Sequence, residues 1–394
     1  MAEAMEKLAT MKFDLVVADY KLGITEPTGA DLADDMKRKL DATPMILLTG
    51  DSSKMQQEFR AKHTAIKEIV DKPPSIAGLK ATINDVIAKS LALEAKRITE
   101  VDEAARKDIE LLCEQISRGE FPDGVHTRRM VEVVRAASLE HPDDNLHTSA
   151  NRVKMADKVA EIIEGNPSLC AAIEHFFTRI EKHSPETYAH INNSTELLAQ
   201  IVATTLMPPN NVGVGAGYTR DVEQGAALCI AVMLHDYGKL YIPEDILHYP
   251  DRLDGAKKTI VKNHVIYSTQ MIDALGLPDS LKDIGKIIAT HHENLDGTGY
   301  PKGARKGRNA DKEEDLPYIT HIHPIIDRFK AMTSKRSYRP NPMSLETATS
   351  IMEDEAKAGM ISGKLLERFM PLMWEFRGRE YIAPSGKEIT GNSR

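Results

Sequence analysis

The first 75 residues alternate between amphipathic segments and short apolar runs. Short apolar runs with helical patterns between them are typical of a parallel α/β unit. We therefore expect one small domain at residues 1–75. Its expected elements are a helix over residues 2–11, a strand over 15–18 that ends in Asp19, a helix near 29–40, and a strand over 45–48 that ends in Thr49.

A long helical pattern follows this domain. From Ser75 to about Ile116 the chain lacks proline and has leucine, isoleucine and valine at helical spacing among lysine and glutamate, which predicts one helix. Such a helix serves either as a homodimer contact or as a solvated connector, and the sequence leaves both open. Because helical patterns continue, we expect a helical linker region at 76–180. Its isolated histidines are interpreted as surface or capping residues: His126, His141 and His147.

Length, charge and cysteine content exclude several classes of protein. A chain of 394 residues is too long for one ordinary core, which predicts two or three domains. The net charge of -8 argues against a nucleic-acid polymer as partner, because such binders need a basic surface. The three cysteines are far apart and odd in number, which argues against a disulfide framework. Since no stretch approaches the roughly 18 to 20 apolar residues of a membrane span, we expect a cytoplasmic protein without a membrane contact.

His235 and Asp236 form an adjacent pair at the end of an apolar helical stretch, residues 228–234, and Lys239 follows them. Burying two adjacent ionisable groups costs free energy unless a metal ion or a partner neutralises them. One helix end thus carries an imidazole, a carboxylate able to bridge two ions, and a cation suited to a phosphate. We interpret the pair as part of a metal centre, in preference to a core histidine beside a capping aspartate.

Further groups of metal-ligand type surround this pair in the sequence. Glu186 and His190 are four residues apart in a helical stretch, so both side chains lie on one face and can converge on one ion. His291 and His292 are consecutive at a helix end and can reach neighbouring ions. The segment after them, up to Pro301, holds two glycines that permit positive φ before a proline-fixed exit. This composition predicts a tight loop folded back over a site.

Three motifs together resemble a known family. The HDxGK pattern at 235–239, the HHExxDGxGYP pattern at 291–301 and the stretch IPEDIL at 242–247 are similar to those of the HD-GYP subfamily of HD-domain phosphohydrolases, bacterial cyclic di-GMP phosphodiesterases. The resemblance covers residues 186–372 and implies an all-α helical-bundle domain at 181–394. It implies these metal ligands: Glu186, His190, His235, Asp236, His264, His291, His292 and Asp327.

The resemblance also implies a reaction. Two or three divalent ions, bridged by Asp236, would activate water to cut cyclic di-GMP to pGpG or GMP. Glu186 matches the additional ligand of family members that bind three ions. Lys239 matches the catalytic lysine that faces the scissile phosphate, and Arg336 and Arg339 match basic positions that hold phosphate or guanine. Histidine and carboxylate donors without a cysteine set favour iron, with manganese or zinc as alternatives.

The chain departs from the family's pattern in three places. Lys330 stands where the family has the second aspartate of DxxDA, Ile191 stands where a serine follows the first histidine, and residues 360–363 replace a Phe-Asp-Pro sequence. None of these changes removes an implied ligand. His323 lies four residues before Asp327, a helical spacing that would permit a shared ion. The family uses neither His321 nor His323, so we expect both beside the ligands or at the surface.

Asp19, Thr49 and Lys72-Pro73 follow strand ends in the order found in response-regulator receiver domains, where these positions are the phosphorylated aspartate, the switch threonine and the lysine. The resemblance covers only the later part of that fold. The first strand, whose acidic pair binds magnesium in the family, has no counterpart, so phosphoryl transfer to Asp19 would lack its main electrostatic stabiliser. We expect either a truncated receiver-like domain that meets a signalling partner or a plain docking module.

Two alternative functions stay open at the level of sequence. The substrate could be another cyclic dinucleotide such as cyclic GMP-AMP, or a smaller phosphoester, although the GYP loop and the two arginines favour a dinucleotide. The chain could also be a weakly catalytic binding module for signalling, as the truncated receiver part and Lys330 suggest. The complete set of ligand-type residues argues against that second alternative.

Overall fold

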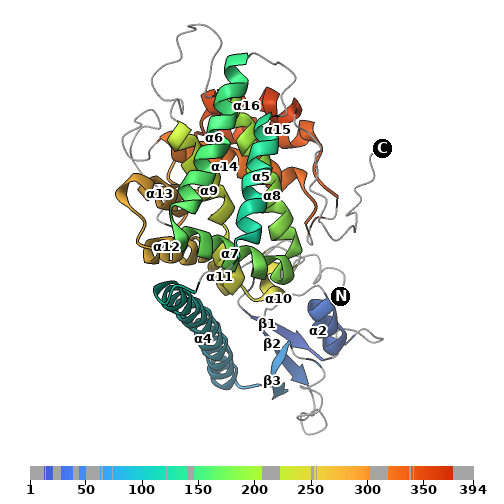
Figure 1. The fold of residues 1–394 in the computed structure, drawn as a ribbon. Coiled ribbons are helices and arrows are strands. Elements are labelled where there is room, and N and C mark those ends of the chain that lie inside the picture. Colours follow the sequence, from blue (N-terminus) through green and yellow to red (C-terminus); the bar gives the residue numbers. More distant parts are fainter. Residues whose placement is uncertain are drawn as a thin grey trace. The chain divides into compact units, whose positions relative to one another are not determined.

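The computed structural model (Figure 1) describes residues 13, 15–20, 28–38, 44–49, 63, 65–72, 74–120, 123–139, 146–205, 222–249, 253, 255–301, 318–336, 339 and 341–375. The chain divides into two compact units. One comprises Met1–Glu100 with Tyr249–Ala256, and the other comprises Val101–His248 with Lys257–Arg394.

The first unit holds a small parallel sheet, as the alternating pattern predicts. Its strands are β1 (Val16–Asp19), β2 (Met45–Thr49) and β3 (Ile66–Asp71), in the order β1-β2-β3. Helix α2 (Gly29–Arg38) contributes Leu32, Ala33 and Met36 to a core that includes Met45 and Leu47 of the central strand. The expected helix over residues 2–11 lies outside the described residues.

Helix α4 (Ile76–Ser117) confirms the predicted long helix to within a residue at each end. It begins where the side-chain oxygen of Ser75 accepts a hydrogen bond from the backbone N–H of Gly78, at 2.9 Å. Its last part, from Val101 on, belongs to the second unit. There Val101, Ala105 and Leu112 are buried at helical spacing, so this end of the helix is packed rather than solvated on all sides.

The second unit is a bundle of helices, shown from green to red in Figure 1. At its centre, α9 is buried on every side from Gly225 to Leu234 and packs against α6, α8 and α13. A helix that is apolar all round needs such a position. The helices are α5 (Val125–Leu139), α6 (Leu146–Glu164), α7 (Pro167–His183), α8 (Pro185–Thr205), α9 (Val222–Leu234), α10 (Glu244–Leu247), α11 (Gly255–Lys262), α12 (His264–Ala274), α13 (Lys282–Thr290), α14 (Ile322–Thr333), α15 (Leu345–Lys357) and α16 (Gly363–Glu375), with 3-10 turns η2 (Tyr237–Tyr241), η3 (Asp279–Leu281) and η4 (Tyr318–His321).

We expected domain boundaries at residues 75 and 180, whereas the two compact units divide between Glu100 and Val101. Helices α5, α6 and α7, which the sequence pattern assigns to a linker, pack against α8 and α9 within the second unit. The physical reason is the apolar face of α7, where Leu169, Ile173 and Phe176 are fully buried. Among the residues that the structure describes, no helix is both long and apolar enough to cross a membrane.

Candidate metal centre

Five parts of the helical unit bring their ionisable residues to one buried place. His190 comes from α8, the pair at 235–236 follows α9, and His264 begins α12. The consecutive histidines follow α13, and Asp327 lies in α14. The side chains buried there are those of His190, His235, Asp236, His264, His291 and Asp327, and His292 is partly exposed. All the predicted ligands but Glu186 therefore lie in one cluster.

Two glycines explain how the backbones come so close. A Cβ atom on Gly238 would lie 2.1 Å from the carbonyl oxygen of His264, so only glycine lets η2 pack on the start of α12. The backbone N–H of Gly238 also donates to the hydroxyl of Ser268, at 2.8 Å. A Cβ on Gly299 would lie 2.3 Å from the backbone nitrogen of Asn294. The loop after α13 is thus folded tightly on itself, as its composition predicts.

Donor atoms in the cluster form three groups whose members lie within 4.8 Å of one another. Asp236 is the central carboxylate, because one oxygen lies 3.2 Å from His235 Nε2 and the other lies 3.4 Å from His264 Nε2. A carboxylate with an oxygen on each side suits a bridge between two ions. The three groups are His190, His235 and Asp327; His235, Asp236 and His291; and His264, His291 and His292.

Backbone carbonyls fix the orientation of the imidazoles. The Nδ1 atoms of His235, His264 and His291 lie 2.8, 2.6 and 2.6 Å from the carbonyl oxygens of the third residue before each. A carbonyl only accepts, so Nδ1 carries the proton and donates, and Nε2 keeps its lone pair toward the cluster. Within the described residues, His235 Nε2 and Asp236 Oδ1 are buried without a hydrogen-bond partner. Free donor atoms of this kind fit divalent metal ions.

The electrostatics of the cluster keep most groups in the form that binds metal. Burial lowers the pKa of His190 and of His264 to about 4, so both imidazoles are neutral at pH 7. Burial would raise the pKa of Asp236, but His235 and Lys239 hold it well below its usual range. Burial alone would lower the pKa of His235, yet the neighbouring carboxylates of Asp236 and Asp327 raise it. A proton therefore competes with a metal ion for the imidazole of His235.

Two of the three predicted substrate-binding cations, Lys239 and Arg336, lie near this cluster, whereas the guanidinium of Arg339 donates to the backbone carbonyl of Ala331. Lys239 Nζ donates to Asp236 Oδ2 at 2.6 Å and is mostly buried. Arg336 and Arg339 form an isolated antiparallel bridge in which each backbone N–H donates to the other residue's carbonyl, at 3.0 and 2.8 Å. The charge of Arg336 contributes to lowering the pKa of His190, so this guanidinium lies in the neighbourhood of His190.

Glu186 stands apart from the three donor groups. It lies in the first turn of α8, one helical turn before His190, as the spacing predicts, and its side chain is partly exposed. Lys330, the cation in place of the family's aspartate, lies near Glu196 of α8, where it opposes the burial that raises the pKa of that carboxyl. The ammonium group of Lys330 therefore lies near the carboxylate of Glu196 in α8.

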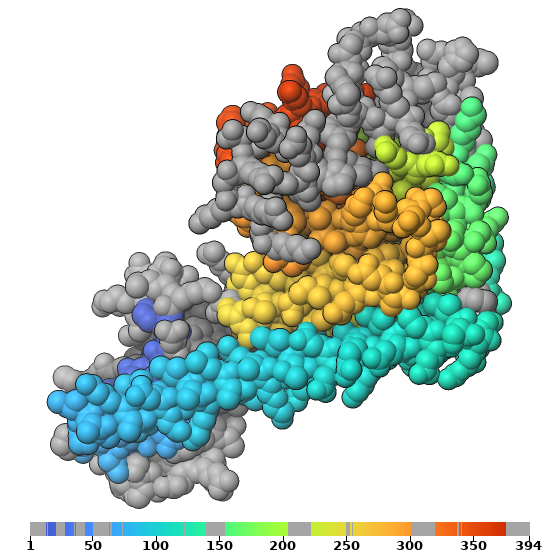
Figure 2. All heavy atoms as spheres, turned by 90° about the vertical axis from the view of Figure 1, so that its left-hand side faces the viewer, coloured from blue at the N-terminus to red at the C-terminus, as the bar shows by residue number. Residues whose placement is uncertain are grey.

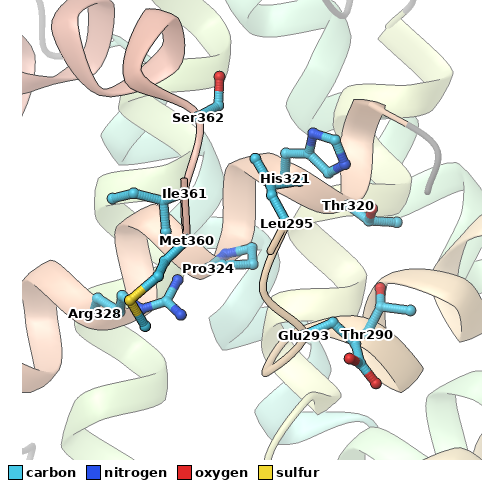
Figure 3. A pocket seen from close by; sticks show the side chains of 10 residues that line it. All are labelled: Thr290, Glu293, Leu295, Thr320, His321, Pro324, Arg328, Met360, Ile361 and Ser362. Atoms are coloured by element: carbon cyan, nitrogen blue, oxygen red, sulfur yellow. The ribbon is translucent and has the colours of Figure 1, made fainter. Parts of the chain in front are cut away.

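The structure also shows contacts that sequence reasoning missed. His323 is fully buried, and its ring centroid lies 4.5 Å from that of His235. Its spacing of four residues from Asp327 places both side chains on one face of α14 and was visible in the sequence. The closeness to His235 was not. His321 lies elsewhere: with Arg328 and Met360 it lines a separate pocket with about 270 Å³ of empty space, shown in Figure 3.

Helix α4 supports the segment that carries the central pair. Asp108 of α4 accepts hydrogen bonds from the hydroxyl of Tyr241, at 2.8 Å, and from the guanidinium of Arg179. The ring of His175 lies 2.8 Å from the same guanidinium and 2.7 Å from the hydroxyl of Tyr237. Because an arginine only donates, His175 Nε2 accepts and Nδ1 donates to Tyr237. These bonds fix both ends of η2, the turn that holds Lys239.

A second contact of α4 reaches the helix that begins with His264. The hydroxyl of Tyr267 in α12 donates to Asp102 of α4, and the thiol of Cys113 lies 3.7 Å from the carbonyl oxygen of Ala274. Figure 2 shows this end of α4 in cyan and teal along the gold segments that include α12. The end of the long helix is thus part of the wall around the centre.

Comparison with known proteins agrees with this geometry. Residues 214–365 match the family described as HD domain. The 3'3'-cGAMP-specific phosphodiesterase 1 of Vibrio cholerae is 33% identical over 150 residues, which are 37% of this chain and 32% of that protein. A cyclic di-GMP phosphodiesterase of Thermotoga maritima is 36% identical over 144 residues, 36% of each chain. A protein of Vibrio cholerae with the name "Probable cyclic di-GMP phosphodiesterase" is 26% identical over 362 residues, 89% of this chain and 66% of that protein.

The chain spans about a third of the first two of these relatives and two thirds of the last. The matched family segment contains the ligand-type residues from His235 to Asp327 and all three sequence motifs. Residues 214–365 therefore form an HD domain, and the chain is similar in sequence to cyclic di-GMP phosphodiesterases.

Proposed function

We propose that this protein is a metal-dependent phosphodiesterase that hydrolyses cyclic di-GMP to pGpG, to GMP or to both in bacterial second-messenger signalling. The observation that carries the proposal is the position of Asp236. Its two oxygens face histidines on either side, and the ammonium group of Lys239 lies 2.6 Å away. The names of the relatives support the same substrate class.

The donor set decides which ions we assign to the centre. Imidazole nitrogen and carboxylate oxygen together suit iron, with manganese and zinc as alternatives. We assign a central pair of ions to the clustered ligands, with Asp236 between them. Glu186 would hold a third ion together with His190, because the two side chains leave one face of α8 a helical turn apart. These ions would supply charge stabilisation to the phosphate and a lower pKa to the attacking water.

The side chains near the ligands bind and orient the substrate. Lys239 presents its ammonium group to the scissile phosphate and stabilises the charge that grows on its oxygens. Arg336 and Arg339 hold the second phosphate or a guanine edge, which a guanidinium fork can bind through two hydrogen bonds. Hydrolysis forms a bond from the water oxygen to phosphorus, breaks the bond to the 3' oxygen, and leaves a proton on that oxygen.

A hydrolysis assay tests the proposal. Protein loaded with iron, manganese or zinc is incubated with cyclic di-GMP, and the products are separated by chromatography. We expect pGpG or GMP from the loaded protein and neither after chelation. Absence of turnover with every metal, while cyclic di-GMP still binds, would instead support a binding module with little catalysis.

A second substrate follows from one specific observation. Among the relatives is a phosphodiesterase named for 3'3'-cGAMP, at 33% identity. The two cyclic dinucleotides differ in one base, so the same centre could cut either of them. Parallel assays with both substrates, compared by kcat/KM, decide between the two, and the higher value identifies the preferred dinucleotide.

We further propose that the first unit is a truncated receiver-like module for a signalling partner, and that α4 makes a homodimer contact. Lys72 forms an ion pair with Asp19, and its backbone N–H donates to the carbonyl of Thr49 at 2.8 Å. These contacts support the receiver-like arrangement. Because residues 1–18 provide no acidic pair for magnesium, we expect no stable labelling of this chain by small phosphodonors. Stoichiometric labelling that is lost in Asp19→Asn would overturn this expectation.

A further inference from the structure

His323 is a buried histidine to which the proposed reaction gives no task. It is fully buried in α14, and neither of its ring nitrogens has a hydrogen-bond partner within the described part of the chain. A neutral imidazole carries one N–H donor and one acceptor nitrogen. Burying both without partners costs the folded protein their lost hydration. An unpaired buried group of this kind in a native protein calls for a bound ion or water.

The ring of His323 lies about as close to two of the proposed ligand rings as those ligand rings lie to one another. Its ring centroid lies 4.5 Å from that of His235 and 5.6 Å from that of His291. The proposed ligands have similar spacings, 5.1 Å for His235 and His291 and also 5.1 Å for His264 and His292. Two imidazoles whose nitrogens are about 2.1 Å from one ion place their centroids roughly 4.5 to 5.5 Å apart.

Helix α14 directs this ring toward the centre. His323 and Asp327 are four residues apart, so they share one face of the helix. Pro324 and Arg328 of α14 line the separate pocket together with His321 of η4, so the pocket lies on another face of the helix (Figure 3). His321 therefore lines the separate pocket, whereas His323 lies beside the metal centre.

We propose that His323 is a further imidazole ligand of the metal centre and donates a ring nitrogen to the ion between His235 and His291. This inference rests on the proposed function in one respect, that the centre binds divalent ions. His323 is outside the three groups of closely spaced donors, so coordination would require its ring to turn about its side-chain torsions. An additional imidazole favours iron, zinc or cobalt over manganese, which prefers oxygen ligands.

Cobalt substitution with two matched variants tests this ligand. His323→Leu removes both nitrogens and keeps the site apolar, and His321→Leu makes the same change in the separate pocket. The measurements are cobalt per chain, affinity by competition with a chelator, and the visible absorption of the bound Co²⁺, which depends on the number of its ligands. We expect His323→Leu to weaken cobalt binding roughly 10- to 100-fold and to alter the spectrum, whereas His321→Leu changes neither.

Stability gives an independent readout. After chelation, His323→Leu should melt at a higher temperature than wild type, because it removes two unpaired buried atoms, while the rise in melting temperature on adding cobalt should become smaller. His323→Gln, which keeps a polar group, covers the case in which the leucine variant fails to fold, and it should also weaken cobalt binding.

Equal cobalt affinity and an unchanged spectrum in the His323 variants would overturn the inference and leave the proposed function intact. A wild-type protein that binds no divalent ion would overturn the proposed function itself.

Discussion

Replacing Lys239 by methionine removes the ammonium group that, among the described residues, touches the central carboxylate. The pair is unusually buried for a charged contact, since the lysine side chain is 16% exposed and that of Asp236 is 1% exposed. Methionine keeps much of the length and volume of lysine. The change therefore isolates the charge, and it leaves Asp236 with only its neighbouring histidines in the metal-free protein.

The magnitude follows from the two states of the centre. Removing one partner of a buried ion pair costs about 3 to 5 kcal/mol. His235, whose pKa is raised, lies 3.2 Å from the same carboxylate and shares in its neutralisation, so we expect about 3 kcal/mol in the metal-free protein. Bound ions neutralise Asp236 by themselves, which leaves a cost near 1 kcal/mol. The difference of about 2 kcal/mol makes metal binding roughly 30-fold tighter in the variant.

Activity should change in the opposite direction. Loss of one cation or donor that stabilises the transition state typically lowers kcat about 10² to 10³-fold. The assay combines urea unfolding of chelated and metal-loaded protein, metal titration and cyclic di-GMP turnover. Lys286→Met is the matched control, because Lys286 and Asp283 are also three residues apart and 2.7 Å from each other but exposed, and such pairs contribute less than about 1 kcal/mol. The reasoning fails if the two variants lose equal stability after chelation, or if metal affinity falls together with turnover.

Three further predictions concern the surroundings of this pair. Because its carboxylate neighbours raise the pKa of His235, metal binding near pH 7 should release a proton from His235. Metal affinity should therefore increase with pH until the pH exceeds that pKa. Calorimetry in two buffers of different ionisation enthalpy should detect the proton release, and equal heats of binding in the two buffers would contradict it. Gly238→Ala should lower metal content, since its Cβ would lie 2.1 Å from the carbonyl of His264, and metal analysis that finds wild-type content would refute this. Tyr241→Phe should cost about 1 kcal/mol in urea unfolding by removing the 2.8 Å hydrogen bond to Asp108; no loss would show that α4 gives η2 no support.

The sequence predicted the parts of the site that depend on local pattern. The apolar stretch before His235 and Asp236 is the buried helix α9, and the glycines after His292 form a tight loop. The long helix was predictable for a similar reason, because its spacing of apolar residues persists over 42 residues without a proline. These features follow from neighbours in the chain, so periodicity and turn chemistry were sufficient.

The missed features depend on which helices meet in space. The spacing of His323 from Asp327 was visible, but its closeness to His235 arises from the packing of α14 beside the end of α9. The bonds from Asp108 to Tyr241 and Arg179 join residues that are 133 and 71 positions apart. The domain boundary near residue 180 differed for the same reason, since α5 to α7 bury their apolar faces on later helices. Contacts of this kind leave no periodic signal in one sequence.

The central claim is that a metal centre built around His235 and Asp236 cleaves a cyclic dinucleotide. The most direct measurement is turnover of cyclic di-GMP by metal-loaded wild type and by the double variant His235→Ala with Asp236→Ala, with metal content and helical circular dichroism measured on the same samples. The account predicts product from the wild type, and none above background from a variant that stays helical and binds less metal. Wild-type turnover by the double variant at matched metal content would contradict it.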